Sequence, residues 1–424
     1  ATDQEVLGSN PSRRTKKKLI KLENKKMNLN KIFFPFILIA SICARIFSIE
    51  YLGDKSIVYN EFGIILFNLE NYGIFGFRQL EGQIFPNIFM PPLYPFFLYF
   101  VKIINPFNNY NVELILYIQL VYSMLGVYFF KKLLMNFFSN NLSNAGALIF
   151  ALFPLNVYSV SQISSISLQS FLLVLYFYLI FKIIKEKNSL KNLLYFSTVS
   201  STLVLLRGEF LLIYFFTLLF IYFYNRKTKF IVSSLIISIL VISPYLIRNY
   251  KIFNTITLTK SFGYNLWKGN NPYSSVSGFE TIERLKVIKK IEKIKSSPKY
   301  DLIIDEIFLE EAVDYIKSDP VRYLNLYFEK VFSFLFLDLK STYPNYYNLA
   351  HILPKIILSI TTLFGAAYLL RQKSILNFFT GYYFFNIFLF SIFFIIPRYS
   401  LILLPAQIIL SCYFFKKLIL IVKN

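Results

Sequence analysis

Long apolar runs and short polar stretches alternate over almost the whole chain. Ten of these runs approach the length of about 20 residues that an α-helix needs to cross a bilayer. They cover residues 32–49, 112–130, 143–158, 165–184, 192–206, 209–224, 230–247, 352–370, 375–396 and 399–415. The pattern predicts an all-α polytopic membrane protein with about ten to twelve transmembrane helices.

Two long segments separate these runs, residues 50–111 and 248–350, and we expect both to form large loops on the outer side of the membrane. In the first, the apolar stretch 91–104 is only about 13 residues long, too short to span comfortably. We interpret it as a helix lying at the outer interface, a further span being the alternative. In the second, helical spacing of apolar residues between 280 and 340 predicts juxtamembrane helices, one of which restarts at Asp319-Pro320.

Composition and charge fit a membrane protein and exclude a soluble globular enzyme. The chain is 56% hydrophobic and 16% charged, whereas soluble domains carry about 25% charged residues. The net charge is +22. With the N-terminus in the cytoplasm, every short loop on that side is basic, which is the positive-inside pattern and no sign of nucleic-acid binding. Residues 1–31 then form a basic cytoplasmic tail, in which 1–26 are expected to be an over-called gene start before Met27, and 32–424 form the membrane domain.

Candidate chemical groups gather at the outer boundary, whereas the predicted span centres carry almost no charge. A pump or ion-coupled transporter would carry ionisable residues in mid-membrane. The outer groups are Asp54, Glu61, Arg207, Glu209, Arg248 and Arg398. Glu61 follows Asp54 by two helical turns, so a helix through both would place them on one face. The single histidine, His351, and two cysteines exclude a His-rich metal site, and a divalent ion has no support beyond the carboxylates of 301–314, which we interpret as a solvated helix face.

The order of motifs resembles that of GT-C membrane glycosyltransferases over about residues 30–415. The most similar branch comprises bacterial relatives of the dolichyl-phosphate-mannose protein mannosyltransferases and the lipid A aminoarabinose transferase. The motifs are Asp54 with Tyr59, Gly73-Ile74-Phe75-Gly76, Pro91-Pro92-Leu93-Tyr94-Pro95, Leu206-Arg207-Gly208-Glu209, Pro244-Tyr245-Leu246-Ile247-Arg248-Asn249-Tyr250, the segment from Gly263 through Trp267 and Asn270 to Pro272, Ala312 to Pro320, and Pro397-Arg398-Tyr399 to Pro405. Asp54-Lys55 and Arg207-Gly208-Glu209 depart from the commoner Asp-Glu or Asp-Ser and Arg-Pro-Glu.

The resemblance implies transfer of a sugar, with inversion, from a polyprenyl-phosphate donor to an envelope glycolipid, polysaccharide or protein. It implies the periplasmic face of a bacterial inner membrane as the place, and Asp54 as the catalytic base. Glu61 is the second candidate acid. Arginine suits a lipid phosphate because it keeps its charge and can bind two oxygens. We therefore expect Arg248, Arg398 and Arg207 to bind the donor phosphate, and Tyr59, Tyr94, Trp267 and Asn270 to contact the sugar or shape the loops.

Each residue also has a structural interpretation. Asp54 and Glu61 could be solvated acids, Arg248 and Arg398 snorkelling residues, Arg207 and Glu209 an ion pair, and Trp267 an interfacial aromatic residue. Two other functions stay open: a polymerase or ligase of diphosphate-linked polysaccharide, and a lipid-linked-sugar transporter or flippase.

Overall fold

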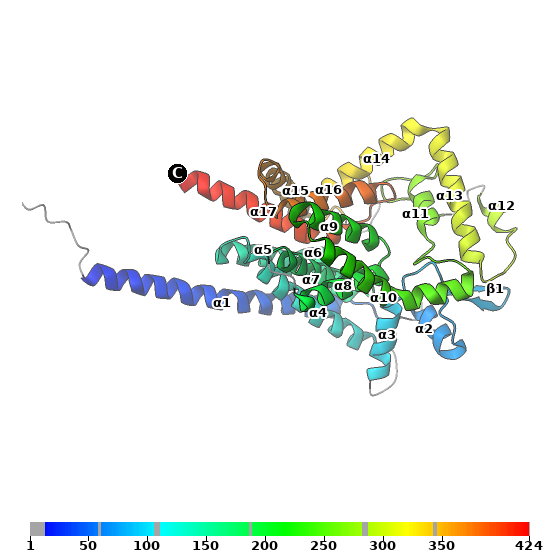
Figure 1. Cartoon of the computed structure of the whole chain (residues 1–424), viewed down its shortest axis with the longest axis horizontal. Helices are drawn as coiled ribbons and strands as arrows, with labels where there is room; N and C mark the ends of the chain where they lie inside the picture. The colour runs from blue at the N-terminus through cyan, green and yellow to red at the C-terminus, as the bar shows by residue number, and fades with distance from the viewer. Residues whose placement is uncertain are drawn as a thin grey trace, which may run out of the picture.

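The computed structural model describes residues 13–57, 61–105, 111–185, 189–281, 287–341 and 346–423, with side chains from Phe33 to Val422. The first helix begins and the last helix ends at one end of the molecule, on the left in Figure 1. The opposite end carries the shorter elements. We call this end the head region, defined as the described residues of 53–105 and 254–341.

Every one of the ten predicted apolar runs forms helix. These helices are α1 (Arg13–Leu52), α4 (Val112–Leu134), α5 (Asn140–Leu152) with α6 (Pro154–Tyr158), α7 (Ile166–Lys185), α8 (Leu190–Leu206), α9 (Phe210–Asn225), α10 (Thr228–Phe253), α15 (Leu349–Leu370), α16 (Asn377–Ser391) and α17 (Ser400–Lys423). Six helices within the described residues are long and apolar enough to cross a membrane, or seven if the bent pair around α5 and α6 counts as one span. The predicted all-α polytopic architecture is therefore confirmed.

Three of the predicted spans are shorter than the rest. The helices α8, α9 and α16 have 17, 16 and 15 residues, which at 1.5 Å per residue gives about 25 Å or less against a hydrocarbon core of about 30 Å. The helix α3 (Leu93–Ile104) has 12 residues, which fits the interpretation that this stretch does not span. Its place at the membrane interface stays a prediction.

The head region consists of short helices and one hairpin. Its elements are α2 (Glu61–Tyr72), β1 (Arg78–Leu80) paired antiparallel with β2 (Gln83–Phe85), α3, α11 (Phe262–Asn270), α12 (Val287–Ile291), α13 (Tyr300–Ser318) and α14 (Pro320–Leu335). The two predicted outer segments pack against each other there. The Lys260 N–H donates to the carbonyl of Ile88 at 2.8 Å, and the ion pair of Arg78 and Asp301 joins the hairpin to α13 at 2.5 Å.

The helix predictions in the second segment are confirmed in part. The helix α14 begins with Pro320, and the Asp319 side chain accepts from the Arg322 N–H at 3.1 Å, the cap expected from the sequence. The charged stretch from Glu280 to Lys295, with isoleucines at helical spacing, predicts helix up to Lys295; this is wrong at its end, because α12 ends at Ile291. The following Ser296-Ser297-Pro298 segment favours a turn, since proline disfavours helix in the residue before it.

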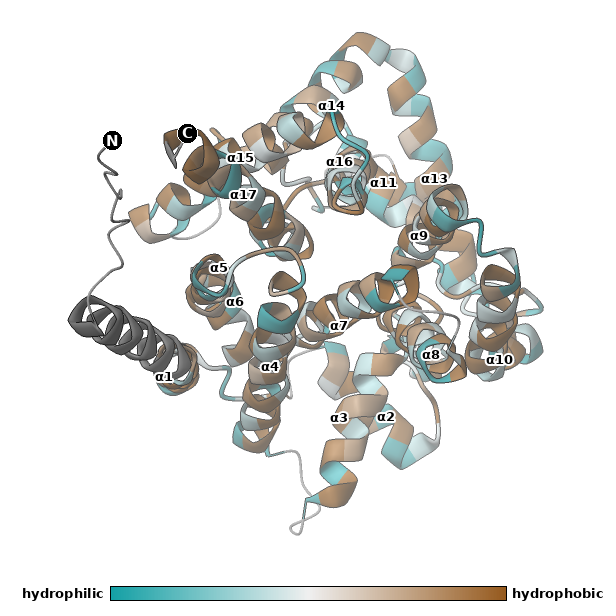
Figure 2. Ribbon diagram, turned by 60° about the vertical axis from the view of Figure 1, so that its left-hand side comes forward, coloured by the Kyte–Doolittle hydropathy of each residue, from teal (hydrophilic) through white to brown (hydrophobic). Residues whose placement is uncertain are grey.

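The helix α7 lies at the centre of the bundle and is the most buried of the candidate spans. It packs against α4, α8 and α17, and Figure 2 shows it between α4 and α8. Its face toward α16 is aromatic: the Phe177 ring meets the Phe379 and Tyr382 rings edge-on at 5.2 and 4.9 Å. Because α7 packs against several helices, the position of its N-terminus is fixed by contacts with all of them.

One predicted span, 143–158, is broken. It bends by 54° where α5 meets α6, because Pro154 has no N–H for the carbonyl of Phe150. The Asn156 side chain donates to that carbonyl at 2.8 Å instead. Arg45, completely buried in α1, donates to the next carbonyl, that of Ala151, at 2.7 Å. The break is thus satisfied by two side chains rather than by helix hydrogen bonds.

Candidate active site

Asp54 lies directly after α1 and is fixed by the segment that leads into α7. Its N–H donates to the carbonyl of Ser161 at 2.9 Å, and its Oδ2 accepts from the N–H of Ile163 at 2.6 Å. Beside it, the Gln162 amide donates to the carbonyl of Leu52 at 3.0 Å. Asp54 is half-buried, so hydrogen bonds fix the position of this carboxylate, and it is not a freely solvated loop acid. Among the described residues, only Oδ2 receives a hydrogen bond, which leaves Oδ1 for a ligand.

Tyr94 supports the same segment from α3. It is 1% exposed, and its hydroxyl donates to the Gln119 Oε1 at 2.9 Å. The Gln119 amide in turn donates to the carbonyls of Val160 and Gln162, both at 2.9 Å. Burial raises the pKa of Tyr94, and the negative charge of Asp54 adds to this effect. Tyr94 therefore shapes the loop behind Asp54, while its burial keeps it from a sugar.

Glu61 does not share a helix face with Asp54, so this prediction is wrong. Residues 53–57 are not helical, and α2 begins only at Glu61. The chain leaves α1 at Gly53, where a Cβ atom would lie 2.2 Å from the Ile49 carbonyl oxygen. Glu61 is exposed, and its charge acts on Tyr264, whose pKa is raised mainly by burial and by Glu280.

Arg207 and Arg398 are brought together around a small hollow at the N-terminal end of α7. The hollow is lined by Ile166, Gln169, Arg207, Glu209, Phe390, Arg398, Tyr399 and Ile402. Arg207 forms an ion pair with Glu209 at 2.5 Å, and its guanidinium lies 5.6 Å from the centre of the Tyr399 ring. Arg398 is exposed. Ile163, whose N–H binds Asp54, precedes Ile166 of the hollow by three residues, so Asp54 is attached to the segment that leads into the same helix.

Arg248 lies away from the hollow, and its guanidinium binds groups of the head region. Its guanidinium donates to the carbonyl of Asn87 and to the Asn249 Oδ1, at 2.7 and 2.8 Å. It also lies against the Phe75 and Phe253 rings. In this arrangement Arg248 ties α10 to the segment around β1 and β2, and it does not line the hollow.

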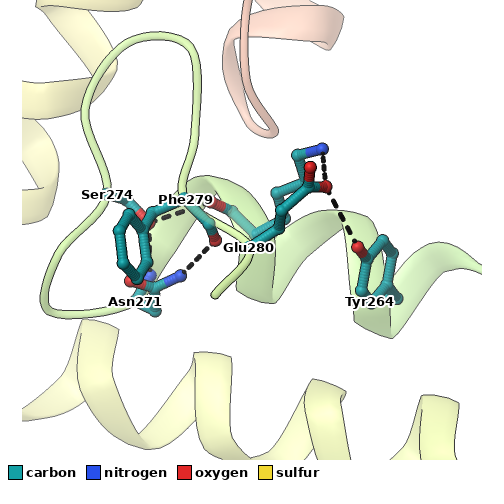
Figure 3. A network of polar contacts seen from close by, with 6 residues as sticks. Tyr264, Asn271, Ser274, Phe279 and Glu280 are labelled. Carbon is teal, nitrogen blue, oxygen red and sulfur yellow. Dashed lines mark hydrogen bonds and ion pairs between the residues drawn. The ribbon is translucent and has the colours of Figure 1, made fainter. Parts of the chain in front are cut away.

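A second charged cluster, missed by the sequence reasoning, lies in the loop after α11 (Figure 3). The Glu280 carboxylate pairs with Lys268 and accepts from the Tyr264 hydroxyl at 3.3 Å. The hydrogen bond from Lys268 lowers the pKa of Glu280, and the charge of Arg398 contributes to the shift. The loop is closed by Asn271, whose amide donates to the carbonyl of Phe279 at 2.8 Å. The sequence did not predict that the loop returns to Lys268, whose carbonyl accepts from the Phe279 N–H at 2.8 Å.

Trp267 packs within the head region, and Asn270 links the head region to the segment after α16. Trp267 is completely buried and packs on Phe308 with ring centres 4.6 Å apart. The Asn270 amide donates to the carbonyl of Ile392 at 2.9 Å. The sequence left open whether Trp267 contacts the sugar or shapes a loop, and the complete burial of its ring favours the structural role. Tyr59 lies outside the described residues.

The acidic residues of α13 do not form a metal site in the described part of the chain. No group of three His, Cys, Asp or Glu side chains there could hold an ion. Asp301 pairs with Arg78, and the Asp305 Oδ1 accepts from the Tyr264 N–H at 3.0 Å. The interpretation of 301–314 as a solvated face is wrong for these two residues, which are buried. Independence from metal stays a prediction.

Comparison with solved structures identifies the fold. The oligosaccharyltransferase of Archaeoglobus fulgidus, solved with a tethered acceptor peptide containing an NVT sequon, matches with a TM-score of 0.55 at 14% sequence identity. The match covers 91% of this chain and 50% of that one, so the chain spans half the length of this neighbour. No protein-family profile and no curated protein sequence matches the chain. The chain therefore shares the fold of this oligosaccharyltransferase over most of its own length.

Proposed function

We propose that the chain is a glycosyltransferase that moves a sugar from a polyprenyl-phosphate donor, with inversion, to a hydroxyl or phosphate of an envelope glycolipid, polysaccharide or protein. The reaction takes place at the periplasmic face of a bacterial inner membrane. One observation carries the proposal: in a chain with this fold, an acid directly after the first membrane helix is held by the Ile163 N–H beside the N-terminus of α7.

The chemistry follows from these groups. The acceptor O–H gives its proton to the free oxygen of Asp54 while the acceptor oxygen bonds to the anomeric carbon. The bond from that carbon to the phosphate oxygen breaks on the opposite face, and the phosphate leaves with the electron pair. Arg398 and Arg207 stabilise the charge that grows on the leaving phosphate. No step needs a metal or a second carboxylate.

The deciding experiment measures transfer of radiolabelled sugar in membranes that contain wild-type protein or Asp54→Asn. The donors are polyprenyl-phosphate-linked hexoses, pentoses and uronic acids. Asparagine keeps the shape but cannot take the proton, so we expect activity to fall by about two orders of magnitude or more. The matched control is Glu50→Gln, which changes an exposed acid at the end of the same helix that bonds only the Tyr117 hydroxyl.

Each result is decisive. Wild-type transfer that survives Asp54→Asn would refute the base assignment. Transfer only from diphosphate-linked glycans would favour the polymerase or ligase. Transfer from no donor would contradict the proposed function and leave the transporter or flippase.

A further inference from the structure

Gln169 is a buried polar side chain that lacks a partner and faces the hollow. It lies in the first turn of α7, is 5% exposed and lines the hollow with Arg207 and Arg398. Its Oε1 accepts no hydrogen bond from any residue that the structure describes. An unpaired amide in a membrane protein interior is costly and is retained where a function requires it.

The two other buried glutamines bind protein atoms, and the unpaired buried amide oxygens of Asn144 and Asn386 do not line the hollow. Gln119 accepts from Tyr94 and donates to two carbonyls. Gln407 on α17 donates to the Tyr383 hydroxyl at 3.4 Å. Both bind protein atoms and neither lines the hollow. A ligand bound at the hollow would give Gln169 a partner; the hollow has no room for a water molecule as it stands, so that ligand must displace part of its lining.

The charges around the hollow indicate the kind of ligand. Arg207 is paired with Glu209, whereas Arg398 forms no ion pair with any residue that the structure describes, so one guanidinium beside the hollow is left for an anion. The N-terminus of α7, a helix of 20 residues, adds a partial positive charge and free N–H groups on the same side. A phosphodiester carries one negative charge and matches this environment, whereas a diphosphate brings more charge than the hollow balances. A carboxamide beside it can bond a sugar hydroxyl, which both donates and accepts.

We propose that Gln169 is a donor-binding residue: it hydrogen-bonds a hydroxyl of the sugar next to the phosphate, while Arg398 and the N-terminus of α7 hold the phosphate. The inference rests on the proposed function and names the ligand of the same site as a sugar on a monophosphate carrier. Gln169 then sets selectivity for the sugar and takes no part in bond making.

Direct binding tests the assignment without catalysis. Wild type, Gln169→Leu and Gln407→Leu in detergent are titrated with undecaprenyl phosphate, undecaprenyl diphosphate and undecaprenyl-phosphate-linked hexoses, pentoses and uronic acids. We expect wild type to bind at least one sugar-bearing monophosphate more tightly than the bare phosphate. Gln169→Leu should weaken that binding about ten-fold and leave the bare phosphate unchanged. Gln407→Leu should change neither.

Thermal stability separates binding from folding. Gln169→Leu removes an unpaired polar group, so its unfolding midpoint should equal or exceed that of wild type, whereas Gln407→Leu breaks a bond and should lower it. The inference is overturned if wild type binds none of the monophosphates, if it prefers the diphosphate, if Gln169→Leu binds sugar-bearing donors as wild type does, or if it also loses the bare phosphate. Sugar-selective binding through Gln169 in a protein that transfers nothing would refute the proposed catalysis and leave this site standing.

Discussion

Lys330 is a lysine placed in the interior of the head region. It is completely buried on α14, and its Nζ donates to the carbonyl of Gly269 at 2.8 Å and to the Asn270 Oδ1 at 3.1 Å. No carboxylate among the described residues forms an ion pair with it. Burial lowers its pKa to about 7. The head region therefore contains a group that loses its charge close to neutral pH.

This lysine should make stability depend on pH. In the unfolded chain a lysine has a pKa of about 10.4. Between pH 7 and this value the unfolded chain holds the proton and the folded protein does not. The free energy of unfolding should therefore rise with pH in this window, by at most about 1.4 kcal/mol per pH unit. Below the folded pKa both states are protonated and the dependence ends.

Thermal unfolding of wild type and Lys330→Met between pH 6 and pH 10 measures the effect. The rise should be smaller in this variant than in wild type, whereas Lys340→Met, which changes a side chain that is 77% exposed, should keep the wild-type rise. Parallel curves for wild type and Lys330→Met would show that the charge of Lys330 is not coupled to folding.

At the residue scale, the sequence located groups that border the membrane but not their partners. Asp54, Arg207 and Arg398 were recognisable from their positions next to apolar runs and from their order. Gln169 was not recognisable, because a single glutamine in an apolar run gives no periodic signal. What distinguishes it is the missing hydrogen-bond partner of its side chain, which only the structure shows. The burial of Trp267 arises from packing between segments about 40 residues apart in the chain, which local pattern does not encode.

At the element scale, one ion pair, that of Arg78 and Asp301, joins the hairpin to α13. Asp301 is 6% exposed on its side chain and Arg78 33%. Burial raises the pKa of Asp301 although the Arg78 charge opposes this effect. Removing either partner would leave a buried group that water cannot reach easily.

Arg78→Met should therefore destabilise the head region by about 2 kcal/mol, less than a fully buried pair because Arg78 is partly exposed. Hydrogen exchange over residues 78–85 and 300–318 should accelerate. The double variant Arg78→Met/Asp301→Leu should recover much of the loss. Glu329→Gln, from a pair in which both side chains are more than half exposed, is the control and should cost less than about 0.5 kcal/mol. Unchanged exchange in Arg78→Met would contradict a coupling role.

Apolar runs predicted the helices because run length and helix length are linked by the bilayer. The bend within 143–158 was not predicted, although Pro154 marks it, since its tolerance depends on donors from α1 and α6. The helix predicted across 54–61 failed because Gly53 and the bond from Asp54 to Ser161 turn the chain away from α1.

At the scale of the whole molecule, the proposal requires the head region to face the periplasm. In a Cys43→Ala background, Ser275→Cys in the loop between Asn271 and Glu280 should react with a membrane-impermeant maleimide added to spheroplasts. Lys373→Cys, between α15 and α16, should react only after permeabilisation. Both positions are exposed, so accessibility to water does not distinguish them. The reverse labelling pattern would exclude a periplasmic active site.

The buried Arg45 has a consequence for biogenesis. During synthesis α1 enters the membrane about a hundred residues before the carbonyl of Ala151, to which Arg45 is bonded, has been made. Until then α1 carries an uncompensated cation and is a poor membrane anchor by itself. The Arg45 Nε also donates to the Ser123 hydroxyl at 2.9 Å. Nascent chains truncated before Ser123 should therefore be extracted by alkali more readily than chains that extend beyond Ala151, and Arg45→Leu should abolish the difference. Insertion of the first helix is thus completed by the fifth.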